Sequence, residues 1–189
     1  MVWCSAIILV LLAFFGASPA KADSVPPELA AAAAKLESAS SYHVAMGTSG
    51  VDPAKGLILA DFEQPDRLYA HFGTMYDIIR IGPNVWMKEP NQPWKQLSDH
   101  GAGPIAAIAP IPFPATARSG PPTLGSDAVG PAHVYVVASE GADPPLQWYV
   151  RIADGRIHRI VGPGKPKNSI MIIDIENYGE KVTIEPPIP

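Results

Sequence analysis

The five histidines are the residues whose side chains could most readily do chemistry, as metal ligands or as general bases. Metal-binding pairs are often spaced i, i+2 or i, i+4, and no two of these histidines have that spacing. The sequence therefore predicts no metal site, and we expect each histidine to be a half-buried strand or loop residue. They are His43, His71, His100, His133 and His158.

Two other sets of residues could support catalysis. Asp174 and Glu176 alternate along an apolar run, so both carboxylates face one side of a strand, but solvation at a strand end explains them more simply. Ser139 has neither the glycine pattern of a nucleophile elbow nor an identifiable base. We predict a binding protein without catalytic residues or a cofactor. An enzyme remains the alternative, because clefts assemble residues that are distant in sequence.

Residues 1–22 have the features of a cleavable export signal. The apolar run of residues 6–15 is followed by a small-x-small site that predicts cleavage after Ala22. No Lys or Arg precedes this run, so an uncleaved anchor is the alternative. We expect a periplasmic or secreted protein. The single cysteine, Cys4, lies ahead of the run, so residues 23–189 must be stable without disulfides.

Composition indicates one globular domain over residues 23–189. The chain has 189 residues with 22 prolines and 16 glycines, and its formal net charge is −4. A charge of this sign and size gives no electrostatic reason to expect nucleic-acid binding. The domain is long enough to bury a sizeable core.

One helix and about ten antiparallel strands account for most of the domain. Residues 26–40 predict a helix, because prolines at the entry lead into a run of alanines. Residues 42–49 read as the first strand, and residues 56–97 as a meander of short apolar runs separated by turns. Strands follow residue 132, with a last short one expected at residues 182–185.

The turn at Asp154-Gly155 lies between two of these later strands. This dipeptide is typical of a two-residue hairpin, in which both turn positions need a positive φ.

Apolar runs without alternation indicate that both faces of this sheet need cover. Examples are residues 57–60 and residues 134–138. A sheet of this size curls or splits into a sandwich. We expect a mainly β, α+β fold in which the sheet forms an incomplete barrel with an apolar groove. The residues expected to line that groove are Ile58, Ala60, Leu68, Phe72, Tyr76, Ile78 and Val136.

The segment of residues 98–131 is expected to act as a lid over that groove. It is rich in proline and carries few charges, so it does not have the composition of a disordered segment. A thin apolar cover over an apolar groove is a design suited to lipid binding. The residues expected to face the groove are Ile105, Ile108, Ile111 and Phe113.

The motif around Pro65 carries a resemblance to a known family. Phe62-x-x-Pro65-Asp66-Arg67-Leu68, followed by residues 78–87 (IIRIGPNVWM) and Trp94, resembles the pattern of the LolA-like periplasmic carriers and their LppX-type relatives. The resemblance implies an unclosed β-barrel with a lid that binds the acyl chains of lipids or lipoproteins. It also implies that Arg67 contacts the lid. Two features depart from the family: the lid is rich in proline, and no lipobox is present.

Two alternatives to a carrier remain at this stage. The same groove could serve an envelope sensor or interaction module of the RseB type, reporting to a membrane-protein partner without transport. The sheet could also close on a packed core in a structural envelope protein. Co-purified lipid would favour a carrier or a lipid sensor over the structural protein.

Overall fold

A computed structural model describes six stretches of the chain. They are residues 25–52, 56–97, 113, 117–139, 142–164 and 166–187. The predicted signal of residues 1–22 lies outside them and remains a prediction, as do the lid roles of Ile105, Ile108 and Ile111. Within the described stretches, no helix combines the length and the apolar character that a membrane span requires.

The helix α2 (Pro27–Glu37) confirms the helix expected near the start of the domain. Proline begins it, Glu28 lies in its first turn and Lys35 in its last turn, where these charges suit the helix dipole. The Ser38 hydroxyl donates to the Ala34 carbonyl at 2.7 Å and helps to end it. Its buried side chains are Leu29, Ala32, Ala33 and Leu36.

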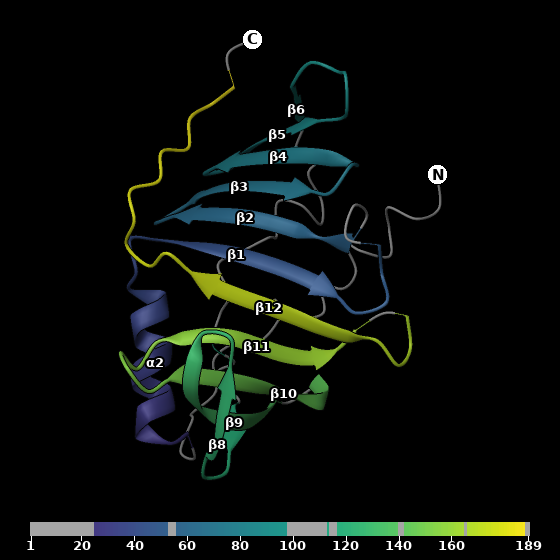
Figure 1. Cartoon of the computed structure of the whole chain (residues 1–189). Helices are drawn as coiled ribbons and strands as arrows, with labels where there is room; N and C mark the ends of the chain where they lie inside the picture. The colour runs from purple at the N-terminus through teal and green to yellow at the C-terminus, as the bar shows by residue number, and fades with distance from the viewer. Residues whose placement is uncertain are drawn as a thin grey trace.

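The strands form one antiparallel sheet in the order β6-β5-β4-β3-β2-β1-β12-β11-β10-β9-β7, with β8 also paired to β9. The sheet is curled and does not close (Figure 1). Its bounds are β1 (Ser41–Thr48), β2 (Ile58–Glu63), β3 (Arg67–Phe72), β4 (Tyr76–Ile81), β5 (Asn84–Lys88), β6 (Lys95–Leu97), β7 (Arg118–Ser119), β8 (Thr123–Asp127), β9 (Gly130–Ser139), β10 (Ala142–Arg151), β11 (Ile157–Pro163) and β12 (Ile170–Glu176). The expected incomplete barrel is confirmed.

The strand count differs from the expectation in two places. β7 and β8 lie within the segment expected to be a loop. The sequence did not predict β8, because this strand is mostly exposed and has no apolar alternation. Residues 182–185 form no strand. They follow β12, whose neighbour β1 is already paired on its other side with β2, so no free sheet edge is beside them.

The β10–β11 hairpin is confirmed, but its turn is longer than expected. Arg151 and Arg156 close it with an N–H to carbonyl bond of 2.9 Å, and the Gly155 N–H donates to the Arg151 carbonyl at 2.8 Å. Gly155 has a φ of +62°, whereas Asp154 does not have a positive φ. The expectation of two positive φ angles was therefore wrong.

The sheet has an inner face, which carries the core, and an outer face. Six of the seven predicted lining residues share the inner face. Val136 does not: it is 53% exposed, while its neighbours Tyr135 and Val137 are 1% and 2% exposed. Side chains alternate along a strand, so Val136 points to the outer face, and its assignment to the lining is corrected.

Candidate functional site

The inner face of β1–β5 is built from cross-strand rows of side chains, all apolar except Arg80. Because neighbouring residues in register lie directly opposite one another, each row crosses several strands. Phe72 and Tyr76 pack at one end of the face, with ring centroids 4.7 Å apart and ring planes tilted by 31°. The rows are Ile58-Phe72-Tyr76, then Ala60-Ala70-Ile78, then Phe62-Leu68-Arg80-Val85.

The helix α2 contacts the other half of the sheet, at β9 to β11. The Glu28 carboxylate accepts hydrogen bonds from Tyr135 Oη at 2.5 Å and from His133 Nδ1 at 2.8 Å. The Lys35 ammonium donates to the Asp154 carbonyl at 2.7 Å. No other helix of comparable length is found in the described stretches.

The hydrogen bonds of Glu28 influence the protonation state of its carboxyl group. The bond from Tyr135 is the largest influence and lowers the pKa of Glu28, and His133 lowers it further against the opposing effect of burial. Burial and the carboxylate raise the pKa of Tyr135. The helix is thus docked by an ionised carboxylate at neutral pH.

Phe113 is the predicted lid residue that the structure describes. Its ring meets Trp148 of β10 edge to face, with centroids 5.2 Å apart and planes at 78°. Trp148 is 2% exposed and belongs to the core on the inner face. Phe113 therefore packs against the inner face, whereas its role as a lid remains a proposal.

Residues 177–187, here called the C-terminal strap, run along the ends of strands β1 to β4 (Figure 1). The Gly179 N–H donates to the Ser41 carbonyl at 2.9 Å, and the Ser41 hydroxyl donates to the Glu180 carbonyl. Ile184 is 4% exposed. The sequence did not predict this strap, because its contacts join residues that are far apart in the chain.

Arg67 and Glu63 clamp the peptide groups of Ile184. Arg67 Nη1 donates to the Ile184 carbonyl at 2.6 Å, and the Ile184 N–H donates to Glu63 Oε2 at 3.2 Å. Arg67 Nη1 also lies 3.9 Å from Glu63 Oε2. The described partner of Arg67 is therefore the strap, and its predicted contact with the lid remains untested.

Replacing Arg67 by Met is expected to loosen the strap without unfolding the domain. One hydrogen bond is worth about 0.5–1.5 kcal/mol. Amide hydrogen exchange of residues 178–185 should accelerate by about three- to tenfold, measured by mass spectrometry. Arg118→Met, on the exposed strand β7, removes the same charge and serves as the control. Unchanged strap exchange in Arg67→Met would show that the clamp does not hold the strap.

Arg80 is a functional candidate that the sequence analysis missed. It follows Tyr76 and Ile78 on the inner-face side of β4, and it lies opposite Leu68 and Val85, which are 0% and 1% exposed. Alternation along residues 76–81 was the signal that could have found it. Only apolar residues were expected to line the face, so the expected lining on β4 ended at Ile78.

Each described histidine is bonded to a carboxylate. Among residues with described positions, no group of three or more metal-binding side chains is close enough to hold an ion. The pairs are His43–Asp61 at 2.8 Å, His71–Asp77 at 2.6 Å, His133–Glu28 at 2.8 Å and His158–Asp127 at 2.9 Å. His100 lies outside the described residues.

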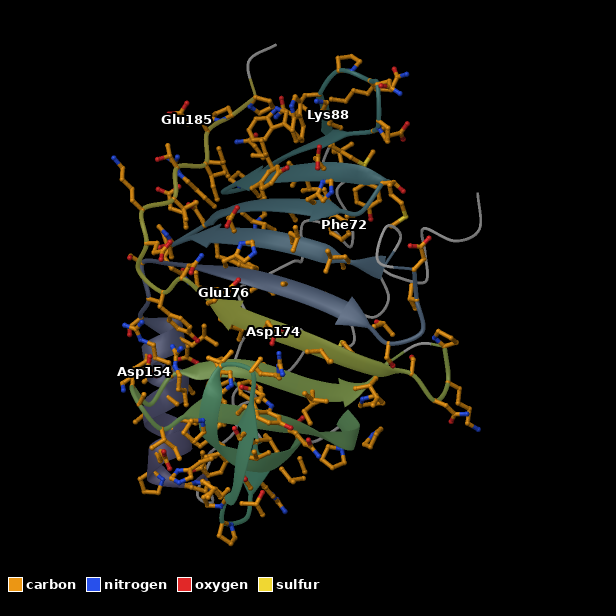
Figure 2. The ribbon with its side chains drawn as sticks, in the orientation of Figure 1. Phe72, Lys88, Asp154, Asp174, Glu176 and Glu185 are labelled. Atoms are coloured by element: carbon orange, nitrogen blue, oxygen red, sulfur yellow. The ribbon has the colours of Figure 1, made fainter. Side chains whose placement is uncertain are left out.

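The carboxylates of Asp174 and Glu176 lie along β12, as expected (Figure 2). Asp174 accepts a hydrogen bond from Arg159 Nε on the neighbouring strand at 2.6 Å. An ion pair with Arg159 therefore accounts for Asp174.

Comparison with known proteins identifies the fold of this chain. No protein-family model and no curated protein sequence matches the chain. The Mycobacterium tuberculosis lipoprotein LppX matches with a TM-score of 0.57 and 12% identity, over 84% of this chain and 96% of LppX. LprF of Mycobacterium bovis matches with a TM-score of 0.54 and 12% identity, over 86% of this chain and 96% of LprF. Such identities show the fold alone, and that fold is LolA-like, as the sequence motif implied.

Proposed function

We propose that this protein is an exported carrier that holds the acyl chain of a lipid or lipoprotein against the inner face of β1–β5. The observation that supports this is the apolar character of that face, in a curled sheet whose described helix lies over the other half. Each methylene transferred from water to an apolar site contributes about 0.8 kcal/mol. A long acyl chain can therefore supply about 10 kcal/mol without a polar contact.

Ligand binding requires the cover of this face to move. Leu68 and Ile78 are 0% exposed and Phe72 is 1% exposed, so their side chains are shut off from solvent. An acyl chain that replaces the cover exchanges one apolar contact for another. The loaded and empty states then lie closer in free energy than the gross burial suggests, which favours release to an envelope partner.

The direct test is lipid extraction from the purified protein. The chain is expressed with its own leader in a bacterial host, recovered from the exported fraction and analysed by mass spectrometry. We expect acyl lipid to co-purify, and a fluorescent acyl-chain probe to bind the delipidated protein. Absence of both co-purified lipid and probe binding would contradict the proposed function.

Phe113→Asp is expected to weaken retention of the acyl-chain probe by about tenfold or more. Burial of one phenylalanine side chain is worth about 1.5–3 kcal/mol, and a charge at this position opposes packing on Trp148. The probe dissociation constant is measured by fluorescence titration. Leu124→Asp is the control, because Leu124 is 77% exposed on β8. Equal probe affinity in Phe113→Asp and wild type would exclude Phe113 from the lid.

A further inference from the structure

Arg80 places a cation on an otherwise apolar part of the inner face. Its cross-strand neighbours on β3 and β5 are Leu68 and Val85. Arg80 is half-buried beside these two aliphatic side chains. On the outer face, Arg159 bonds Asp174 at 2.6 Å and lies 3.2 Å from Asp127.

Two neighbouring groups favour the charged form of Arg80. Burial is the largest influence and lowers the pKa of Arg80, while the charge of Asp66 and the Tyr42 phenol act in the opposite direction. Asp66 lies in the exposed turn before β3, and its carbonyl accepts the Gly82 N–H at 3.1 Å. The guanidinium stays protonated at any pH of interest, with five N–H donors in a planar fork.

The position of Arg80 defines a polar end and an apolar end of the inner face. It lies one residue from Ile81, the register partner of Arg67, and therefore near the strap. The rows that lead away from it along β4 contain Ile78 and Tyr76. Four residues of strand span about 13 Å, so a chain anchored at Arg80 would run along aliphatic and aromatic side chains.

We propose that Arg80 binds the anionic head group of an amphiphile, a carboxylate or a phosphate, whose acyl tail lies along the inner face. The inference rests on the proposed function and narrows it to a ligand class. A guanidinium fork bonds two oxygens of a carboxylate or a phosphate at once, and it can do so while also facing Asp66. The apolar rows provide most of the binding free energy, and Arg80 provides selectivity for an anionic head group.

The test compares competitors that share one sixteen-carbon chain and differ in the head group. A fatty acid, an alkyl phosphate and a fatty alcohol displace the fluorescent acyl-chain probe from the delipidated protein at pH 8. In the wild type we expect at least one of the anions to bind about tenfold more tightly than the alcohol. In Arg80→Met, this preference should disappear while the alcohol binds within about threefold of wild type.

Two further variants complete the test. Arg118→Met removes the same net charge from the exposed strand β7 and should retain the preference. Arg80→Lys keeps the charge but lacks the fork, so it should retain only part of the preference. Arg80→Lys also supplies the answer if Arg80→Met does not fold.

The outcomes separate the two proposals. If the wild type binds none of the three amphiphiles, the proposed function itself fails. If it binds anions and alcohol equally, or if Arg80→Met and Arg80→Lys both retain the full preference, acyl-chain binding stands and the role of Arg80 is overturned. If the anion preference depends on Arg80, comparing the fatty acid with the alkyl phosphate identifies which head group is preferred.

Discussion

Trp148→Ala is expected to lower the free energy of unfolding by about 3–5 kcal/mol, the range for removing a large aromatic side chain from a core. Trp148 is 2% exposed and lies in register between Tyr135 on β9 and Ile160 on β11. Phe113 contacts its ring from the segment between β6 and β7. The substitution therefore removes packing between three strands and Phe113 at one position.

The measurement is urea denaturation followed by far-UV circular dichroism, because the variant itself changes the fluorescence. Trp148→Phe should cost far less, since it keeps an aromatic ring and removes an indole N–H that has no described hydrogen-bond partner. Trp86→Ala, on a half-exposed strand position, is the size-matched control and should also cost much less. A loss in Trp148→Ala no larger than in Trp86→Ala would show that Trp148 does not anchor the core.

The architecture could be predicted from the sequence because local signals agreed with one another. Proline and alanine fixed the helix near residues 27–37, and turn residues such as Gly82 separated the strands of the meander. Apolar runs on both faces required a curled sheet. These signals depend on neighbours a few residues apart, and they gave the strands β1 to β5 nearly in full.

Features that depend on distant contacts could not be predicted. The clamp on the strap joins Arg67 to Ile184 across 117 positions, and no local pattern indicates that Ile184 is buried. In β9 the run of residues 134–138 is apolar on both faces, so periodicity could not decide whether Tyr135 or Val136 faces inward. The candidate site was found where alternation was clear, and it was misassigned where alternation was absent.

On the outer face, an ionic contact holds the turn of the β8–β9 hairpin. The turn of the β8–β9 hairpin lies against β11 (Figure 1). A β-bulge at residues 157–159 of β11 places both His158 and Arg159 beside Asp127. Asp127 therefore joins the hairpin turn to a bulge that lies two strands away.

The Asp127 carboxylate is held by donors on two sides. Oδ2 lies 2.9 Å from His158 Nε2 and 3.2 Å from Arg159 Nη1, while Oδ1 accepts the Val129 N–H at 2.9 Å. The side chains of Asp127 and His158 are 9% and 3% exposed, so solvent does little to screen this pair. Burial alone raises the pKa of Asp127, but these hydrogen bonds and charges together lower it below its ordinary value of 3.8.

Asp127→Ala is accordingly expected to lower the free energy of unfolding by about 3 kcal/mol, because it leaves His158 buried without its partner. The measurement is urea denaturation at pH 7, monitored by circular dichroism. Asp127→Asn keeps the shape and should lose less. Asp174→Ala is the control, since Asp174 is 38% exposed and bonds the same Arg159, and its cost should be smaller.

The pH dependence of the free energy of unfolding of Asp127→Asn tests the same interaction independently. The folded-state pKa of Asp127 lies below its unfolded value, so its ionic contribution is complete above pH 3.8 and is lost as pH falls through the folded-state pKa. The stability difference between wild type and Asp127→Asn should therefore be largest near neutral pH and shrink in acid. A difference that stays constant from pH 7 to pH 2 would show that the charge of Asp127 does not stabilise the hairpin, and that its shape alone does.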